Sequence, residues 1–358
     1  MKSVLRLYTD NSYYQTEHRA YLADLLRPFI NKRTLDQNRA IYGAMVDRYA
    51  LVGSFEQADW AVLPMAWNYY HRFGQIPRAL GFIERARQAG KPVITWTMGD
   101  FGGRVPVEDD VWVFGAAGYK RRAGSRRFGT PVFINDPLPE LNMADIWPRS
   151  KGLRPRLGFC GYARVSTGKA AGIALRTLLR NAACNIHWSG DEPQDVIPPV
   201  LLRQRILGLL RRSPQVETDF IRRTQYKAGA RTPKEERKAR REFLGNIRDT
   251  DYTVCVRGGG NFSVRLYETL AMGRIPILVD TDCLLPYADD LGWRECCVYV
   301  RWAEVDQIAE KVQAFHDRLS EGAFVEIQYR ARRFWEERLS FNGFFTHFPE
   351  HLSFGTSR

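Results

Sequence analysis

The chain alternates between short apolar runs and longer segments whose apolar residues recur every three or four positions. The runs have the length and β-branched content of buried strands, and the longer segments have the period of amphipathic helices. Strands are expected at residues 4–8, 60–63, 93–96, 111–114, 131–134, 157–160, 185–188 and 298–300. Helices are expected at residues 82–89, 169–181, 305–319 and 325–339. This alternation predicts an α/β fold in which helices cover parallel sheets.

A proline-rich stretch divides the pattern into two parts. Four prolines lie in or beside residues 140–154, which we interpret as a linker. A chain of 358 residues also exceeds one typical core. We therefore predict a Rossmann-like domain at 1–150, a second at 151–335 and a tail at 336–358 that can pack back on the first. Ligands of open parallel sheets bind beyond the carboxyl ends of the strands, so the two domains should face a shared cleft.

Residues 254–280, VCVRGGGNFSVRLYETLAMGRIPILVD, predict a strand, a glycine loop, a helix and a second strand. Gly258, Gly259 and Gly260 carry no Cβ atoms, so the backbone N–H groups of the loop can approach an anion closely. The N-terminus of the following helix adds positive potential at the same place. The loop is neither a dinucleotide fingerprint, because Ser263 replaces the third glycine, nor a Walker A loop. A tight turn without a ligand is the alternative.

Charged and polar side chains flank this loop. Arg257, Ser263 and Arg265 offer donors that suit a diphosphate, since a guanidinium can bind phosphate oxygens in pairs. Arg265 and Glu268 are three residues apart and share a helix face, where a weak surface ion pair is one interpretation. The other interpretation gives Arg265 to a phosphate and Glu268 to ribose hydroxyls. These residues therefore predict a nucleotide-linked substrate.

The same segment resembles the hallmark of the exostosin family, family 47 of the glycosyltransferases. Residues 257–276, RGGGNFSVRLYETLAMGRIP, are similar to its pattern R-G-x-G-N-x-S-x-R-x-x-E-x-L-x-x-G-x-I-P. Shorter similarities occur in order at residues 55–64, 158–164 and 285–293. The likeness is dense only over residues 252–293.

The resemblance implies a GT-B fold, in which two Rossmann-like domains face each other. It implies transfer of a sugar from a nucleotide diphosphate, usually uridine-linked, with inversion at the anomeric carbon and without a metal. It also implies that the second domain binds the donor, with Arg257, Ser263 and Arg265 at the diphosphate and Glu268 at the ribose. Asn261 is counted with the glycine loop on the donor side.

Inverting transfer requires a base that takes the proton of the acceptor hydroxyl. Asp100 follows a predicted strand between glycines, and Asp10 follows the first predicted strand, so both are candidates. For each of them the alternative is an aspartate that only forms a turn. Arg164 and Lys169 follow another strand and are predicted to reach the second phosphate. A solvent-exposed helix start is the alternative for Lys169.

The net charge of +13 is concentrated in residues 200–241, which hold 13 Lys or Arg and four Asp or Glu. In residues 200–212 several leucines fall near one helix face, which allows contact with an anionic membrane surface. An acidic glycan or a solvated basic rim are the alternatives. Nucleic-acid binding is a rival function, but the segment lacks interleaved aromatics and a known reading motif, so we expect no nucleic acid. A non-catalytic nucleotide- or glycan-binding relative is a further rival.

The remaining features concern location and cofactors. The six cysteines form no CxxC pair, which favours reduced thiols and a cytoplasmic protein. No apolar run is long enough for a membrane span, so any membrane contact is expected to be peripheral. Asp280 and Asp282 are interpreted as loop residues, and no metal or other cofactor is expected. The sequence therefore predicts an inverting glycosyltransferase with a UDP-linked donor and a glycan or lipid-linked glycan acceptor.

Overall fold

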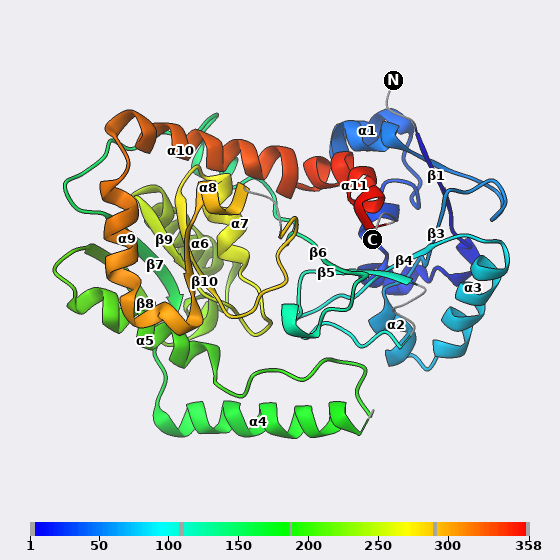
Figure 1. Ribbon diagram of the computed structural model, residues 1–358, viewed down its shortest axis with the longest axis horizontal. Helices are drawn as coiled ribbons and strands as arrows, with labels where there is room; N and C mark the ends of the chain where they lie inside the picture. Colours follow the sequence, from blue (N-terminus) through cyan, green and yellow to red (C-terminus); the bar gives the residue numbers. More distant parts are fainter. Residues whose placement is uncertain (1–3, 107–110, 187, 289–291, 356–358) are drawn as a thin grey trace.

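The computed structural model describes residues 4–106, 111–186, 188–288 and 292–355. Figure 1 shows two α/β halves side by side, each built around one sheet. The first sheet has the strand order β2-β1-β3-β4-β5-β6, and all its pairings are parallel. Its strands are β1 (Leu5–Tyr8), β2 (Tyr49–Leu51), β3 (Trp60–Val62), β4 (Val93–Trp96), β5 (Val111–Gly115) and β6 (Arg127–Gly129). Its helices are α1 (Leu35–Tyr42), α2 (Trp67–Arg72) and α3 (Ile76–Gln88).

The second sheet has the order β11-β10-β9-β7-β8 and is also parallel. Its strands are β7 (Arg156–Tyr162), β8 (Glu217–Arg223), β9 (Tyr252–Cys255), β10 (Ile275–Asp280) and β11 (Val298–Arg301). Its helices include α4 (Thr167–Asn185), α5 (Pro199–Arg212), α6 (Pro233–Arg248) and α7 (Val264–Ala271). They continue with α8 (Gly292–Cys296), α9 (Ile308–Asp317) and α10 (Glu321–Phe334), and the last helix, α11 (Phe341–Gly355), packs on the first sheet.

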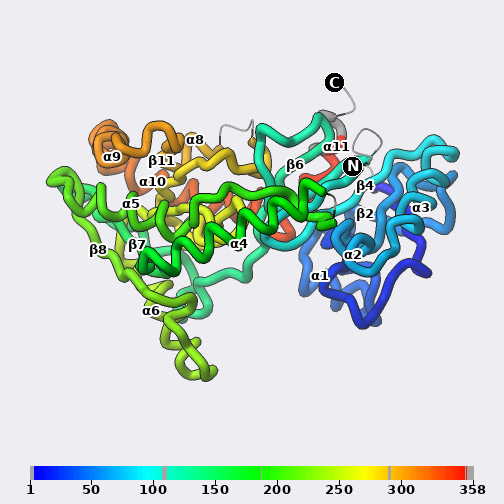
Figure 2. The backbone as a smooth tube through the Cα atoms, turned by 90° about the horizontal axis from the view of Figure 1, so that it is seen from below, coloured from blue at the N-terminus to red at the C-terminus, as the bar shows by residue number. Residues whose placement is uncertain are grey.

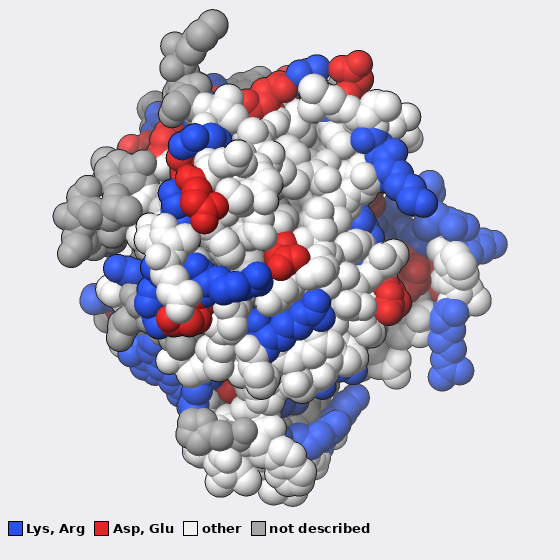
Figure 3. Space-filling model, turned by 90° about the vertical axis from the view of Figure 1, so that its right-hand side faces the viewer, with Lys and Arg blue, Asp and Glu red and all other residues white. Residues whose placement is uncertain are grey.

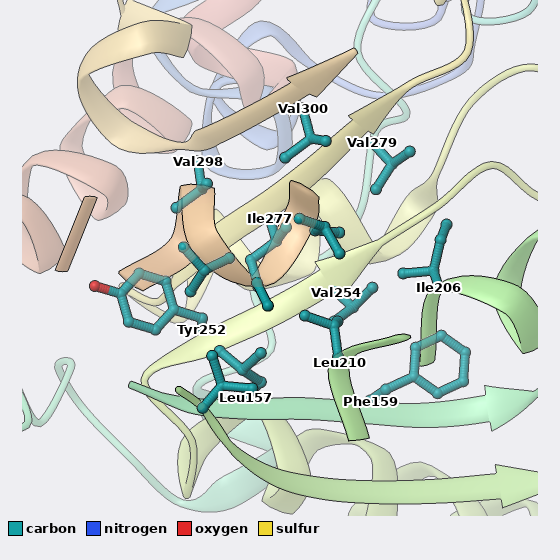
Figure 4. Packing of buried hydrophobic residues seen from close by; sticks show 14 of the residues in the cluster. Leu157, Phe159, Ile206, Leu210, Tyr252, Val254, Ile277, Val279, Val298 and Val300 are labelled. Atoms are coloured by element: carbon teal, nitrogen blue, oxygen red, sulfur yellow. The ribbon is translucent and has the colours of Figure 1, made fainter. Parts of the chain in front are cut away.

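Both sheets are covered on both faces, which explains why their central strands are apolar throughout. In β5, Val111 and Val113 pack with α2 and α3, whereas Trp112 and Phe114 pack with α11 on the opposite face. In the second half, Figure 4 shows strand residues such as Val254 and Ile277 meeting side chains of α5. The predicted α/β fold with two parallel sheets is confirmed.

The end of the chain crosses from the second half to the first. In Figure 1, α10 lies along the top of the second half and α11 on the first half. Phe344, Phe345 and Phe348 of α11 are fully buried in the core of the first sheet. The hydroxyl of Tyr49 donates a hydrogen bond to the carbonyl oxygen of Phe345. The last helix therefore belongs to the core of the half in which the chain begins.

Two predicted strands are wrong. Residues 131–134 have no regular structure, and the strand of this region is β6, which ends at Gly129. A Cβ at Gly129 would lie 2.5 Å from the carbonyl carbon of Leu285, so the chain here approaches the other half closely. The strand expected at 185–188 is also wrong, since α4 extends to Asn185.

The missing strand lies in the basic segment that we expected to be mostly helical. It is β8, an edge strand whose residues are mostly half-buried, so its sequence ETDFIRR shows no apolar run. An edge strand buries less side-chain surface than a central strand, and polar residues are compatible with it. The helices α5 and α6 precede and follow it.

Candidate functional site

The glycine loop that follows β9 lies directly against the loop that follows β4 in the other half. A Cβ at Gly260 would collide with the carbonyl oxygen of Asp100, and a Cβ at Gly259 would lie 3.1 Å from its Oδ2. The N–H of Gly258 donates to the carbonyl of Phe262 at 2.8 Å and closes the loop. The structure thus brings Asp100, a predicted base, to the predicted donor loop. Close approach of the two loops is the reason for glycine at position 260.

Three arginines surround the loop without a negative partner. Arg257 is 2% exposed, and Arg203 and Arg265 are half-buried. The Nε atom of each is buried and has no hydrogen-bond partner. Within the part of the chain that the structure describes, no carboxylate forms an ion pair with any of the three. Three guanidinium groups with unused donors in one place have the chemistry to bind an anion with several oxygen atoms.

Backbone carbonyls hold these arginines in position. Arg203 donates from Nη2 to the carbonyl of Arg257 at 2.7 Å and from Nη1 to that of Tyr162 at 3.2 Å. Arg257 donates to the carbonyl of Ile197 at 3.1 Å. Because a carbonyl is neutral, these bonds orient the guanidinium groups without neutralising them.

The arginines also repel one another. Burial, together with the positive charges of Arg265 and Arg257, lowers the pKa of Arg203 to about 9. Burial lowers the pKa of Arg265 as well. Its guanidinium carbon lies 4.0 Å from the ring centroid of Phe159, a cation–π contact that stabilises the charge in part. A bound anion would relieve this repulsion.

Gly161 at the end of β7 makes room for Arg265. The Nη2 atom of Arg265 donates to the carbonyl of Cys160 at 2.7 Å, and a Cβ at Gly161 would lie 2.7 Å from the same nitrogen. Arg265 also donates to the carbonyl of Val254 at 3.3 Å. The likeness to the family pattern at residues 158–164 therefore has a physical basis, since a side chain at position 161 would displace the arginine.

The substitution Gly161→Ala tests this contact. It is expected to weaken the binding of uridine diphosphate at least about tenfold, because Arg265 loses its position and one charge-assisted bond is worth about 1.5–3 kcal/mol. Gly168→Ala is the matched control, since a Cβ at Gly168 has no neighbour within 4 Å. Isothermal titration calorimetry measures both. Equal affinities in the two variants would contradict the role given to Gly161.

Glu268 is buried and is paired with Arg240 of α6 rather than with Arg265. Arg240 also donates to both carboxylate oxygens of Glu140, at 2.8 and 3.0 Å. The surface ion pair between Arg265 and Glu268, one of the two interpretations of their spacing, is therefore wrong. Across the described ranges, Oε2 of Glu268 has no hydrogen-bond partner, which leaves it able to accept one from a ligand.

Asn261 and Ser263 lie on the same loop but differ in what they offer. The fully buried Asn261 amide donates to the carbonyls of Gly118 (2.9 Å), Thr281 (3.2 Å) and Asp282 (3.0 Å). This side chain joins loops of both halves, so we assign it to loop positioning. Ser263 occupies the N-cap position of α7 without a side-chain capping bond. Its hydroxyl remains a candidate for contact with a donor.

Arg164 and Lys169 are exposed beyond the end of β7. The ammonium of Lys169 lies 5.6 Å from the ring centroid of Tyr162, whose carbonyl accepts a bond from Arg203. The backbone of Arg164 donates to the carbonyl of Arg223 at 3.2 Å. Tyr162 thus connects Lys169 to the arginine cluster. Neither the side chain of Arg164 nor that of Lys169 is fixed by a described hydrogen bond. Their contact with a phosphate stays a prediction.

The structure does not bring Asp10 to the glycine loop. Its carboxylate accepts hydrogen bonds from the backbone and hydroxyl of Ser12 and from Arg85 of α3, at 3.2 Å. Burial alone would raise the pKa of this carboxyl, but the bonds from Ser12 and Arg85 outweigh it and lower the pKa. A capped, ion-paired carboxylate is a weaker base, so the geometry favours Asp100 over Asp10.

Arg203 was not among the predicted residues. It belongs to the basic segment, where we expected several leucines of residues 200–212 to fall near one helix face. Arg203 precedes the buried Ile206, Leu207 and Leu210 by three, four and seven positions, which places it on the face of α5 turned to the core. That spacing was the available signal: an arginine on a buried helix face needs a partner.

The same helix corrects the expected membrane contact. Most apolar residues of α5 are buried in the core of the second half, whereas Leu201 is exposed and Leu209 is partly buried, so the helix presents no continuous apolar face to a bilayer. Several basic residues of 200–241 also have acidic partners: Arg205 pairs with Asp306, Arg223 with Glu242, and Lys227 with Glu236. The buried leucines of residues 200–212 are therefore unavailable for the membrane contact that the sequence suggested.

The described residues contain no group of three or more His, Cys, Asp or Glu side chains placed to hold a metal ion. All six cysteines are buried and free. Of the helices in the described ranges, none is long and apolar enough to cross a membrane.

Comparison with curated proteins gives a short but consistent similarity, whereas no protein-family model matches the chain. The chain is 33% identical over 57 residues to the probable glucuronosyltransferase GUT1 of Oryza sativa subsp. japonica, covering 16% of this chain and 14% of that protein. Identity and coverage are the same for the probable beta-1,4-xylosyltransferase IRX10 of Arabidopsis thaliana. The match thus spans about one seventh of the length of these relatives.

Solved structures resemble the chain only remotely. A glycosyltransferase from Rickettsia africae ESF-5 is 8% identical, covers 99% of this chain and 98% of its own, and has a TM-score of 0.38. A Thermobaculum terrenum O-GlcNAc transferase mutant is 15% identical, covers 98% of this chain and 67% of its own, and has a TM-score of 0.40. TM-scores this low do not establish a shared fold. The predicted resemblance to exostosin-like glycosyltransferases is confirmed over the short stretch shared with the plant proteins.

Proposed function

We propose that this chain is a glycosyltransferase that moves a sugar from a nucleoside diphosphate to a hydroxyl of a glycan or lipid-linked glycan. The observation that carries the proposal is the cluster of Arg203, Arg257 and Arg265 around the glycine loop, whose Nε atoms are buried and which have no carboxylate partner among the described residues. The similarity to probable glucuronosyl- and xylosyltransferases supports it. We propose uridine as the nucleoside, inversion at the anomeric carbon, and a cytoplasmic location.

Positively charged groups bind the nucleotide part of the donor in this proposal. The diphosphate binds to the three guanidinium groups and the N-terminal end of α7, while Oε2 of Glu268 accepts a bond from a ribose hydroxyl. As the bond from sugar to phosphate breaks, negative charge grows on the leaving diphosphate. Fixed positive groups stabilise that charge in the transition state without having to reorganise. The proposal requires no metal and no other cofactor.

The acceptor side uses Asp100. The acceptor oxygen attacks the anomeric carbon from the face opposite the diphosphate, and a carbon–oxygen bond forms as the bond to phosphate breaks. The electron pair of the broken bond leaves on the diphosphate oxygen. The hydroxyl proton passes to the carboxylate of Asp100, which lies beside Gly259 at the edge of the donor loop.

The experiment that tests this function measures hydrolysis and transfer from nucleotide sugars of uridine, guanosine, thymidine and cytidine. Arg265→Met and Glu268→Gln are each expected to lower kcat/KM at least about 100-fold, equivalent to about 2.7 kcal/mol of transition-state stabilisation. Glu236→Gln is the control, because this glutamate is exposed and pairs only at the surface with Lys227.

The outcomes separate the possible functions. Wild-type activity in both Arg265→Met and Glu268→Gln would contradict the donor assignment. A wild-type protein that binds uridine diphosphate but transfers no sugar to any acceptor would instead be a non-catalytic relative.

A further inference from the structure

The long helix α4 stands apart from both cores. It comprises 19 residues, of which only Ala170 and Cys184 are buried. In Figure 1 it runs below the molecule from the second half toward the first, and Figure 2 shows it from below, lying across both halves. Its far end is fixed to the first half. There the guanidinium of Arg180 lies 3.7 Å from the ring centroid of Phe101, and the N–H of Arg104 donates to the carbonyl of Gly190 at 2.8 Å.

The outer face of α4 is apolar and exposed. Leu175, Leu178 and Leu179 are 57%, 50% and 63% exposed, and Ile186 at the C-cap is 69% exposed. Their spacing of three, four and seven residues places them on one side of the helix. Trp188, just beyond the helix, is 82% exposed. Single apolar residues on a surface are common, but a continuous stripe of this kind indicates a binding surface.

The charged side chains of α4 and its flanks are basic, and the first acidic residue after them is Asp191. Residues 163–190 contain no Asp or Glu but include Arg164, Lys169, Arg176 and Arg180. Figure 3 views the molecule from the side of the first half, and its lower end shows mainly uncharged side chains with Lys, Arg and a little acidic surface nearby. Leucine on one face, basic residues beside it and a tryptophan at the end are the composition of helices that lie in the headgroup region of a bilayer.

We propose that α4 binds the surface of a bilayer that contains anionic lipid, with its axis in the membrane plane. The leucine face enters the boundary between headgroups and acyl chains, and the basic residues meet the negative headgroups. A second copy of the chain is a poorer partner, because a two-fold contact through this face would bring two exclusively basic helices together. We thus assign the membrane contact to α4 instead of residues 200–241.

The proposal goes beyond sugar transfer and does not depend on it. The helix begins directly after the loop of β7, so binding would set Arg164 and Lys169 close to the headgroups. Vesicle binding is measured without donor or acceptor, and its failure therefore leaves the proposed reaction untouched.

The test is sedimentation of the full-length protein with vesicles of phosphatidylcholine alone or with 30% phosphatidylglycerol, at about 50 and 500 mM salt. Wild-type protein is expected to bind the mixed vesicles at low salt, more weakly at high salt and weakly to pure phosphatidylcholine. The double variant Leu175→Glu/Leu179→Glu is expected to bind at least tenfold more weakly. Leu153→Glu is the control, since this leucine is 99% exposed and lies outside α4.

A second pair of variants avoids new charge. Trp188→Ala is expected to weaken binding, and Trp147→Ala, which removes a tryptophan that is 66% exposed elsewhere, is not. Thermal unfolding checks that all variants remain folded. Absence of wild-type binding at low salt, or equal binding by wild type and the α4 variants, would overturn the proposal. The proposal would also be overturned if the wild-type protein did not bind vesicles and instead formed a dimer in solution that the Leu175→Glu/Leu179→Glu variant dissociates.

Discussion

Replacing Asp100 by Asn is expected to lower kcat for sugar transfer by about 100- to 10,000-fold, the usual contribution of a positioned general base. Affinity for uridine diphosphate should stay the same or rise slightly. The reason is that the carboxylate of Asp100 lies beside Gly259 at the donor loop, where its negative charge opposes a phosphate. Steady-state kinetics with a UDP-sugar and calorimetry with uridine diphosphate measure the two quantities separately.

Asp10→Asn is the control for this prediction. Its carboxylate caps a turn and pairs with Arg85, away from the loop, so kcat should change less than about threefold. A large loss in Asp10→Asn together with an active Asp100→Asn would reverse the assignment of the base.

The second large effect concerns nucleotide binding. The double variant Arg203→Met/Arg257→Met is expected to bind uridine diphosphate at least about 100-fold more weakly, because hydrogen bonds between charged groups are worth about 1.5–3 kcal/mol each. Methionine fills much of the same volume, which limits the loss of packing. Arg205→Met is the matched control: this arginine lies two residues from Arg203 on α5 but pairs with Asp306 at the surface.

Calorimetry and thermal unfolding distinguish binding by the specific arginine cluster from binding by general positive charge. If Arg205→Met weakened binding as much as the double variant, general positive charge would explain the affinity and the specific cluster would not. Uridine diphosphate should also raise the unfolding temperature of the wild type and of Arg205→Met, since a ligand that binds only the folded state stabilises it. The double variant should show a much smaller rise.

The central unit of the second half could be predicted from the sequence because its signals are local. The strands β9 and β10 are buried on both faces, so residues 252–255 and 275–280 read as apolar runs. The glycines between them mark the loop, and α7 follows with a strong helical pattern. Arg257 and Arg265, which we propose to bind the diphosphate, lie in the same segment.

Other parts depend on contacts that no local pattern reveals. The edge strand β8 carries charged residues because it is half-buried, and it was missed. Arg203 is 54 residues from Arg257 in the sequence, and only the packing of α5 brings them together. The choice between Asp100 and Asp10 required the contact between Asp100 and Gly259 across the two halves. The direction of α4, away from its own sheet, was equally hidden, because its apolar spacing suits a core helix as well.

The crystal structure of the protein with bound uridine diphosphate tests the central claim most directly. The account predicts that oxygen atoms of the diphosphate lie within hydrogen-bond distance of Arg203, Arg257 and Arg265, with the ribose at Glu268. A nucleotide bound elsewhere, with the three guanidinium groups still unpartnered, would contradict it.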